Sequence, residues 1–544
     1  MLASAATDIE ATLFDLIVIG AGINGAGIAR DASQRGLRVL LLDKGDIASG
    51  TTSWSTRLIH GGLRYLEHGE VSLVRESLRE RERLFKIAPH LVRPLPMIIP
   101  IYERQRRGPL KIRAGMIAYD LLSLDKSLGR HQMLSREETL RRVPGLRAEG
   151  LRGAALYYDA QVEYAERLVL ENALSAREHG AQVHTYARVE RFIVEEGAVR
   201  GLEFRDEAQG GLRRVRAHVT VNVSGPWVDS VLGALERPQA RLIGGTKGSH
   251  IVVYDFPGAP TDALYVEAHE DGRPFFIIRW NGMYLIGTTD SPYDGDPGMA
   301  AADEREIEYL LRETNRIIPS AALSRASVLY TYSGVRPLAY EEGRAGGSIT
   351  RRHFVHDHAG ELEGFLSIVG GKLTTYRNLS EQAVDLVFKK LGREPRPRCE
   401  TARLTLPGAS LPDFAAFAQH FKSASGLAPE VADHLLRVYG ARAPFVLELA
   451  AEGPDLAELF SPRTGAIGAE VLMSFRHEMA RTLTDCLLRR TMVGMNGSLG
   501  LDAVEAAARI AQKYLGWSRA RAEQETAAYR QYVERFHTRS LPAT

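Results

Sequence analysis

The chain has 544 residues, 44% of them hydrophobic and 25% charged, and its formal net charge is +2. This balance is typical of a globular protein of two or three domains, and it provides no global field that would favour nucleic acid or a membrane surface. The two cysteines, Cys399 and Cys486, exclude a disulfide-dense scaffold and a thiolate metal site, and they are typical of a reducing compartment.

The segment Met1–Phe14 has neither the basic stretch nor the apolar stretch of a secretory signal. No segment approaches the ~18–20 consecutive apolar residues of a membrane-spanning helix. We therefore expect no secretory signal, and we expect any contact with a membrane to be peripheral.

The segment Asp15–Asp46, DLIVIGAGINGAGIARDASQRGLRVLLLDKGD, predicts a strand, a tight turn, a helix and a second strand. In its G-x-G-x-x-G motif, Gly20 permits the turn, Gly22 lets the backbone approach a pyrophosphate, and Gly25 lets the helix pack on the strand. Asp43 ends the second strand, where its carboxylate can accept hydrogen bonds from a ribose. These features occur in the required order and predict a dinucleotide site, although the motif does not separate FAD from NAD.

Three segments rich in charge or proline come next. Val71–Ala88 has helical spacing, and we expect most of its arginines to lie on a solvated face. Pro89–Tyr102 is apolar and interrupted by prolines, which favours a strand over a helix. Tyr102–Leu124 places a basic run ahead of an amphipathic stretch, which fits either a surface loop with a core helix or an interfacial anchor on anionic lipid.

Strands dominate the middle of the chain and helices its C-terminal part. A predicted helix at Glu163–Ala181 precedes many strand-like runs, among them the buried run Val219–Trp227, which ends at Ser-Gly-Pro and can deliver backbone to a ligand. From about Leu404 the periodicity is helical. A boundary within Pro395–Pro412 is predicted to divide residues 1–400 from an all-α unit at residues 401–544.

Several cationic or imidazole side chains occur in apolar or glycine-rich strand contexts. They are His60, Arg64, His250, Arg336, Arg351 and Lys372. A charge at the end of a buried strand is costly without a partner, so each could form a structural ion pair. Several together favour a small anionic substrate instead, because arginine binds phosphate or carboxylate in a bidentate way. Thr288 and Thr289 would add hydroxyl groups.

The order of the motifs DLIVIGAGINGAGIARDA, LIHGGLRYLEHGE, KGSHIVV, IGTTD, YSGVRPL, ITR and GGKLTTYR resembles that of the FAD-dependent, aerobic-type glycerol-3-phosphate dehydrogenases. The resemblance covers roughly residues 15–391 and extends to a helical C-terminal cap. It implies an α/β fold of glutathione-reductase type. A Rossmann-like FAD-binding domain would be interleaved with a β-rich substrate domain of D-amino-acid-oxidase layout, followed by an all-α C-terminal cap domain.

The resemblance also implies which residues bind FAD. Segment Ser49–Arg57 would pass the pyrophosphate and the flavin, and Asp43 stands where the family often has a glutamate, which shortens the reach to the ribose. No metal is implied. The implied cofactor residues are Gly20, Gly22, Ile23, Asn24, Gly25, Asp43, Lys44, Thr51, Thr52, Ser53, Ser55, His60, Gly61, Gly62, Ser224, Gly225, Trp227, Gly371, Lys372, Leu373 and Thr374.

The implied substrate is sn-glycerol 3-phosphate, with its phosphate clamped by Arg336 and Arg351. Glu67 and His68 are expected to be structural. The other residues implied to line the substrate pocket are Arg64, Tyr65, His250, Thr288 and Lys372.

The implied reaction oxidises the C2 alcohol to a ketone, giving dihydroxyacetone phosphate, by hydride transfer from C2 to flavin N5. A side chain must also accept the hydroxyl proton. His250 is the first candidate, because a neutral imidazole suits this task near pH 7, and His60 is the second. Lys372 and Arg336 are expected to act as electrostatic stabilisers of a developing alkoxide, unless strongly desolvated.

Electrons are expected to pass to a respiratory quinone at the inner face of the cytoplasmic membrane, with Tyr102–Leu124 as the candidate membrane contact. Two alternatives stay open: an oxidase that uses oxygen and releases hydrogen peroxide, and a non-catalytic flavin-binding module. A homodimer is a further expectation, whereas the short basic run RQRRGPLKIR and the small net charge argue against nucleic acid. The C-terminal helices would cap the active-site domain, mediate oligomers or meet a partner. The residues before Asp15 have no interpretation.

Overall fold

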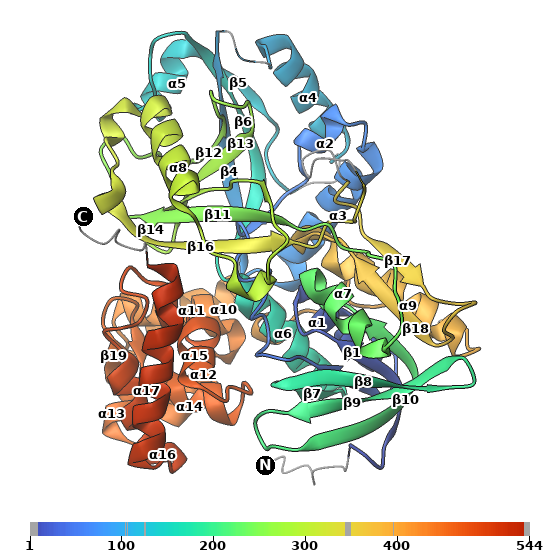
Figure 1. Ribbon diagram of the computed structural model, residues 1–544. Helices are drawn as coiled ribbons and strands as arrows, with labels where there is room; N and C mark the ends of the chain where they lie inside the picture. Colours follow the sequence, from blue (N-terminus) through green and yellow to red (C-terminus); the bar gives the residue numbers. More distant parts are fainter. Residues whose placement is uncertain are drawn as a thin grey trace, which may run out of the picture.

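The computed structural model describes residues 9–103, 105, 107–123, 127–342, 350–394 and 396–537 (Figure 1). Two sheets and a group of C-terminal helices make up this part of the chain. None of its helices combines the length and the apolar character that crossing a bilayer requires.

The first sheet has a parallel centre. Among the described residues it comprises eight strands, with the order β17-β18-β10-β1-β2-β7 and with β8 and β9 joined to β10 as an antiparallel extension. β1 runs parallel to β2 and to β10, which predicts a ligand at their common carboxyl edge. The strands are β1 (Leu13–Ile19), β2 (Val39–Leu42), β7 (Gln182–His184), β8 (Ala187–Glu195), β9 (Ala198–Asp206), β10 (Leu212–Asn222), β17 (Phe354–Asp357) and β18 (Phe365–Val369).

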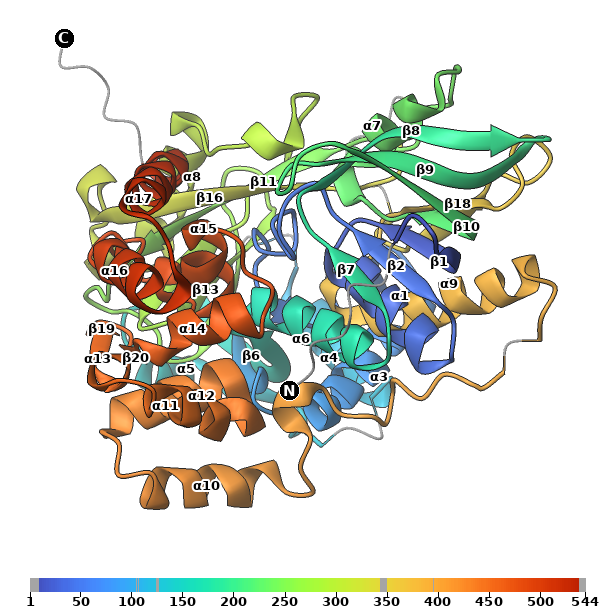
Figure 2. The ribbon, with the colours of Figure 1, turned by 90° about the horizontal axis from the view of Figure 1, so that it is seen from below.

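Helices α1, α6 and α9 share a buried apolar core with this sheet. α1 is almost wholly buried, as its small and aliphatic residues allow, and it contacts both α6 and α9 (Figure 2). The helices of this region are α1 (Ile23–Gln34), α3 (Val71–Ile87), α6 (Ala165–Glu178), α7 (Val228–Leu232) and α9 (Tyr376–Lys390).

The second sheet is mainly antiparallel and combines strands from distant parts of the chain. Among the described residues it has ten strands, with the order β15-β11-β14-β13-β12-β4-β6-β3, while β16 pairs with β11 and β5 with β6. Its strands are β3 (Leu58–Ile59), β4 (Val92–Tyr102), β5 (Gln132–Ser135), β6 (Leu151–Val162), β11 (Thr246–Val253), β12 (Ala263–Glu267), β13 (Pro274–Trp280), β14 (Met283–Gly287), β15 (Ser291–Pro292) and β16 (Val328–Arg336). Its helices are α2 (Arg64–Glu67), α4 (Pro109–Leu121), α5 (Arg136–Arg142) and α8 (Glu304–Ile317).

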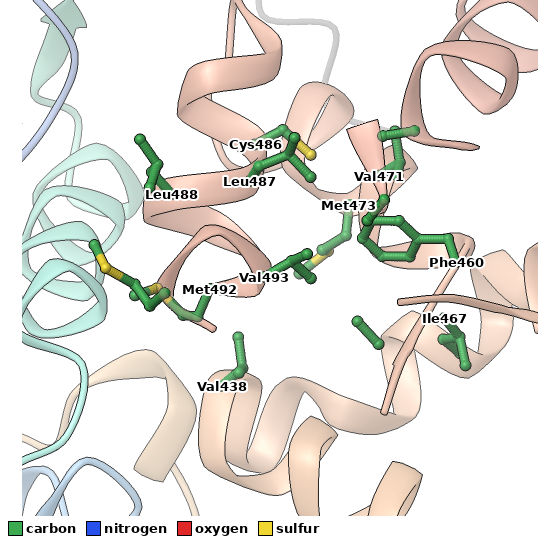
Figure 3. Packing of buried hydrophobic residues seen from close by; sticks show 14 of the residues in the cluster. Val438, Phe460, Ile467, Val471, Met473, Cys486, Leu487, Leu488, Met492 and Val493 are labelled. Atoms are coloured by element: carbon green, nitrogen blue, oxygen red, sulfur yellow. The ribbon is translucent and has the colours of Figure 1, made fainter. Parts of the chain in front are cut away.

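The C-terminal helices pack on an apolar core of their own that continues into the second sheet. Leu487, Val493 and Phe460 lie inside it (Figure 3), and Trp280 and Tyr332 of the sheet belong to the same buried cluster. The helices are α10 (Phe414–Ala424), α11 (Pro429–Tyr439), α12 (Ala443–Ala450), α13 (Pro454–Ala457), α14 (Ala469–Arg476), α15 (Leu483–Asp485), α16 (Val504–Leu515) and α17 (Arg519–Val533), with a π-helical turn at Cys486–Arg490 and a small hairpin of β19 (Leu459–Ser461) and β20 (Ala466–Ile467).

The element types follow the sequence patterns in most places, and two details differ. Arg81 of α3 is fully buried, because its guanidinium pairs with Asp159 of β6 at 2.8 Å, so it does not belong to the solvated face expected for the arginines of this helix. The hairpin β19–β20 interrupts the all-α pattern. The division at residues 400 and 401 stays a prediction, and Pro395 of the predicted boundary lies outside the described residues.

Candidate active site and cofactor site

A cavity of about 320 Å³ lies where the carboxyl ends of β1, β2 and β10 meet. Gly20 has a φ of +114°, and a Cβ atom there would lie 2.8 Å from the carbonyl oxygen of Val223. A Cβ on Gly25 would lie 1.8 Å from the carbonyl oxygen of Gly20. Both positions therefore require glycine, and the turn that they form brings the N-terminus of α1 to the cavity, where it favours phosphate groups.

Polar groups of the cavity suit the remainder of a dinucleotide. The Asp43 carboxylate accepts hydrogen bonds from the amides of Ala21 and Gly45 at 2.6 and 2.8 Å, and it lines the cavity as an acceptor for a ribose hydroxyl. The side-chain oxygen of Asn24 is buried and has no partner among the described residues. This donor and acceptor set fits FAD, with the α1 terminus for its pyrophosphate and Asp43 for its ribose.

Most of the predicted cofactor residues line this cavity. They are Gly20, Gly22, Ile23, Asn24, Asp43, Lys44, Thr51, Thr52, Ser55, Ser224, Gly225, Trp227, Gly371, Lys372 and Leu373. Arg188 and Val189 of β8 line it as well and were absent from the sequence prediction, because a short strand segment without glycine carries no signal for a nucleotide.

Three predicted cofactor residues line neither this cavity nor the adjoining one in the described part of the chain. Gly25 packs against Gly20, the buried hydroxyl of Ser53 donates to Ala48 at 2.6 Å, and the Gly61 amide donates to Tyr119 at 2.9 Å. These residues contact the backbone or the side chains next to the cavities and do not face them.

A second cavity, of about 270 Å³, adjoins the first and shares Thr51, Ser55, Gly371, Lys372 and Leu373 with it. It contains every residue that was predicted to bind substrate or to take part in catalysis, together with two further cofactor candidates, Gly62 and Thr374. The assigned residues are His60, Arg64, Tyr65, His250, Thr288, Arg336, Arg351 and Lys372. His68, expected to be structural, also lines this cavity, whereas Glu67 pairs with Arg107 as a structural residue would.

His250 is a buried, neutral imidazole. Burial, followed by the nearby Arg336 and Arg57, lowers the pKa of His250 to about 3. Its Nε2 is hydrogen-bonded to the hydroxyl of Thr56 at 3.0 Å, and a Cβ on Gly287 would lie 2.6 Å from the ring. The ring is therefore fixed in place, and it can exchange a hydrogen bond with a hydroxyl group.

Lys372 is the buried amine of the cavity. Its Nζ donates to the Ser77 hydroxyl at 2.9 Å and lies 4.6 Å from the centre of the Tyr65 ring. Burial lowers the pKa of Lys372 to about 7, with Arg351 acting in the same direction and Asp159 opposing it. This amine can therefore gain or lose a proton near neutral pH.

Arg336 already has a carboxylate partner. Its Nη1 lies 2.9 Å from Asp290 Oδ1, and its Nη2 donates to the hydroxyl of Thr288 at 3.0 Å. Burial, followed by the charge of Arg351, lowers the pKa of Arg336 to about 10. Burial alone would raise the pKa of Asp290, but the two arginines hold it below its ordinary value. Arg336 and Arg351 therefore both place positive charge close to Asp290.

His60 is neutral as well, because burial and then the charges of Lys372 and Arg351 lower its pKa far below the ordinary range. Thr56 and Asp290 are partners that the sequence analysis did not assign, although both stand inside motifs that it used, SGTTSWSTR and IGTTD. No group of three or more His, Cys, Asp or Glu side chains in the described residues is arranged to hold a metal ion.

The fold and the two adjoining cavities define a flavin-dependent oxidoreductase. A family model described as "FAD dependent oxidoreductase" matches residues 15–377, and one described as "C-terminal domain of alpha-glycerophosphate oxidase" matches residues 399–522. The glycerol-3-phosphate dehydrogenase of Synechocystis sp. is 46% identical over 539 residues, which cover 97% of each chain. The aerobic glycerol-3-phosphate dehydrogenase of Staphylococcus haemolyticus is 33% identical over 493 residues, 88% of this chain and 86% of that one.

Among solved structures, the glycerol-3-phosphate dehydrogenase from Bacillus halodurans complexed with FAD aligns with a TM-score of 0.79 and 29% identity, over 97% of this chain and 96% of that chain. The chain belongs to the FAD-dependent glycerol-3-phosphate dehydrogenase family. The predicted family, the predicted fold class and the prediction of an FAD enzyme are thereby confirmed.

Replacing Gly25 by alanine is expected to abolish FAD binding, because the new Cβ would collide with the backbone of Gly20, which cannot move away as a side chain could. The ratio of flavin to protein absorbance after purification measures this. Gly233→Ala is the matched control, since its Cβ meets no heavy atom within 4 Å and its φ is −57°. A normal flavin content in Gly25→Ala would contradict the assignment of this turn.

Proposed function

We propose that the protein oxidises the C2 hydroxyl of sn-glycerol 3-phosphate to give dihydroxyacetone phosphate and passes the electrons to a respiratory quinone. The observation that carries the proposal is the enclosure of one small cavity by cations and a neutral imidazole beside the FAD site. The cations are Arg57, Arg64, Arg273, Arg336, Arg351 and Lys372. Arg57 and Lys372 are buried, Arg64, Arg336 and Arg351 are half-buried, and Arg273 is exposed. Cations of this number match a small dianion such as a phosphate monoester.

The phosphate is assigned to Arg336 and Arg351. A guanidinium that already holds Asp290 at 2.9 Å is oriented in advance, and the Thr288 hydroxyl, which accepts from it and donates to the Thr289 carbonyl at 3.0 Å, helps to hold it. The phosphate contributes binding energy away from the reacting carbon, which the enzyme can use to orient C2.

Bound FAD supplies the hydride acceptor for this chemistry. The chain must receive the hydroxyl proton, and we propose an order of the candidate bases that differs from the one expected from the sequence. A base works best when its pKa lies near the working pH, which matches Lys372 at about 7 and disfavours His250 at about 3. We assign proton acceptance to Lys372, and we assign orientation of the C2 hydroxyl to His250, whose ring is held by Thr56.

Anaerobic addition of sn-glycerol 3-phosphate is expected to bleach the flavin absorbance. In Arg336→Lys the same titration should require on the order of 10- to 100-fold more substrate, because a charged hydrogen bond of the bidentate fork is worth about 1.5–3 kcal/mol. Arg142→Lys, which alters an exposed arginine paired with Asp262, serves as the control and should behave as wild type. A wild-type substrate requirement in Arg336→Lys would contradict the assignment of Arg336 to the phosphate. Absence of bleaching in the wild type would contradict sn-glycerol 3-phosphate as the substrate.

The rate of flavin reduction at saturating substrate is expected to rise with pH through about 7, because only the neutral amine of Lys372 accepts a proton. Lys372→Met should lower the rate on the order of 100-fold and remove this pH dependence. Lys513→Met, at an exposed ion pair with Asp455, is the control. If the pH profile of Lys372→Met kept the same inflection near pH 7, the inflection would belong to ionisation of the substrate phosphate and the assignment of Lys372 as proton acceptor would be wrong.

The exposed residues of helix α4 support the proposal that the protein contacts the membrane that holds the quinone. Leu110, Ile117 and Leu121 on this helix are 82%, 46% and 60% exposed, and Lys111 and Arg113 beside them are exposed cations. This combination suits the surface of an anionic bilayer. Arg104, Arg106 and Leu124 of the predicted Tyr102–Leu124 contact lie outside the described residues.

The same helix lies next to the substrate cavity. Lys111 is 3.4 Å from Glu67 of α2, the short helix that carries Arg64 and Tyr65, and Figure 1 shows α4 and α2 at the same end of the molecule. A membrane at α4 would thus bring a quinone near the flavin. We therefore propose attachment to the inner face of the cytoplasmic membrane. The homodimer stays a prediction.

Vesicles of anionic lipid that contain a quinone are expected to bind the protein in flotation assays and to raise its glycerol-3-phosphate:quinone activity. Replacing Leu110, Ile117 and Leu121 by serine should abolish both effects, while Leu459→Ser, at a 42% exposed leucine of the C-terminal domain, should change neither. Stoichiometric release of hydrogen peroxide without quinone reduction would assign oxygen as the acceptor. Equal flotation of all variants would exclude α4 as the contact.

A further inference from the structure

The C-terminal cap meets the FAD-binding domain at a buried carboxylate, that of Asp46, which follows β2 and has 0% of its side chain exposed. Arg489 Nε lies 2.6 Å from Asp46 Oδ2, and both Nη atoms of Arg490 lie 2.8 Å from the carboxylate oxygens. This bidentate pairing fixes the orientation of the carboxylate. Although burial favours the neutral form, the two arginines hold the pKa of Asp46 below its ordinary value.

The two arginines come from the π-helical turn Cys486–Arg490. Successive side chains diverge less on a wide π turn than on an α-helix, so neighbouring guanidinium groups can reach one carboxylate. π turns are rare and occur frequently at functional sites. Arg489 also donates to Asp485 at 2.7 Å, and Arg490 Nε donates to the carbonyl oxygen of Glu478 at 2.6 Å. Two arginines thus face two aspartates, and the cluster is balanced in charge and well bonded.

Asp46 belongs to the turn that presents Asp43 to the cofactor cavity. The Asp43 carboxylate accepts from the amides of Ala21 and Gly45, and the amide of Ala48 donates to the Ala21 carbonyl at 3.0 Å. The turn and the glycine loop are therefore one hydrogen-bonded unit. A displacement of Asp46 would move the ribose acceptor and the loop together.

Tyr186 links the same turn to the cap a second time. Its amide donates to the Gly45 carbonyl at 2.9 Å, and its hydroxyl donates to Asp485 at 2.7 Å. The cap therefore reaches the turn from two sides, through the Asp46 carboxylate and through Tyr186.

We propose that the C-terminal cap is a clamp on the FAD site, in which Arg489 and Arg490 position Asp46 and thereby the turn that carries Asp43. Asp46 is a positioning residue for cofactor retention. This role is independent of the substrate and of the electron acceptor, so it stands or falls separately from the proposed reaction.

Asp46→Asn removes the charge and keeps the size of the side chain. The holoenzyme of this variant is expected to release FAD roughly tenfold faster or more after dilution, measured as recovery of flavin fluorescence, because two buried arginines lose their partner. Glu171→Gln is the matched control. Glu171 is also 0% exposed and holds the C-terminal segment through the Gly408 amide at 3.0 Å, but its partners are Gly408 and His90 rather than the turn. It should lower the unfolding midpoint and leave FAD release unchanged.

The proposed role of the cap would be overturned if Asp46→Asn released FAD at the wild-type rate, or if Glu171→Gln accelerated FAD release to the same extent. Arg490→Met and Arg490→Lys provide the test if Asp46→Asn yields no folded holoenzyme. Methionine should accelerate FAD release, and lysine should restore part of the retention, since it keeps the charge and loses the fork. Equal release from both variants and wild type would likewise overturn the proposal.

Discussion

The parallel register of β1 with β2 and β10 is the constraint on which the rest of the molecule depends. Ile19 pairs with Leu42 on one side and with Asn222 on the other, so the three strands end at the same level. The glycine loop, the Asp43 turn and Ser224 therefore meet at one edge, and the N-terminus of α1 faces the same space. A register shift in any strand would separate these groups and destroy the FAD site.

The positive charge of the second cavity is only partly compensated by the residues that the structure describes. Asp290 and Asp159 offset part of the positive charge around Arg336, Arg351 and Lys372, and burial makes the remainder costly. This cost keeps His250 neutral and brings Lys372 into the neutral pH range. A small dianion would relieve the same cost, so the proposed substrate selection and the proposed proton acceptance would have one electrostatic origin.

The C-terminal helices contact both the second sheet and the residues next to the two cavities. Their apolar core continues into the second sheet through Trp280 and Tyr332, and their π turn holds Asp46 beside the FAD site. Phe536 at the end of the described chain packs on Trp54, with ring centres 5.0 Å apart, and Trp54 lines the substrate cavity. The described residues of the cap thus contact both sites through Asp46 and Trp54 without lining either cavity.

The cofactor turn and most of the basic residues of the second cavity could be predicted from the amino-acid sequence alone. The spacing of the glycines predicts the turn, and cations at predicted strand ends indicate an anionic ligand. Neither prediction requires knowledge of the neighbouring side chains. The partners of the charged side chains could not be predicted: Arg81 is buried against Asp159, Arg336 holds Asp290, and Asp46 meets arginines more than 440 positions away. The proposed order of the candidate bases differs from the sequence-based expectation for the same reason, because a pKa depends on burial and on charges from distant segments, which only the folded chain brings together.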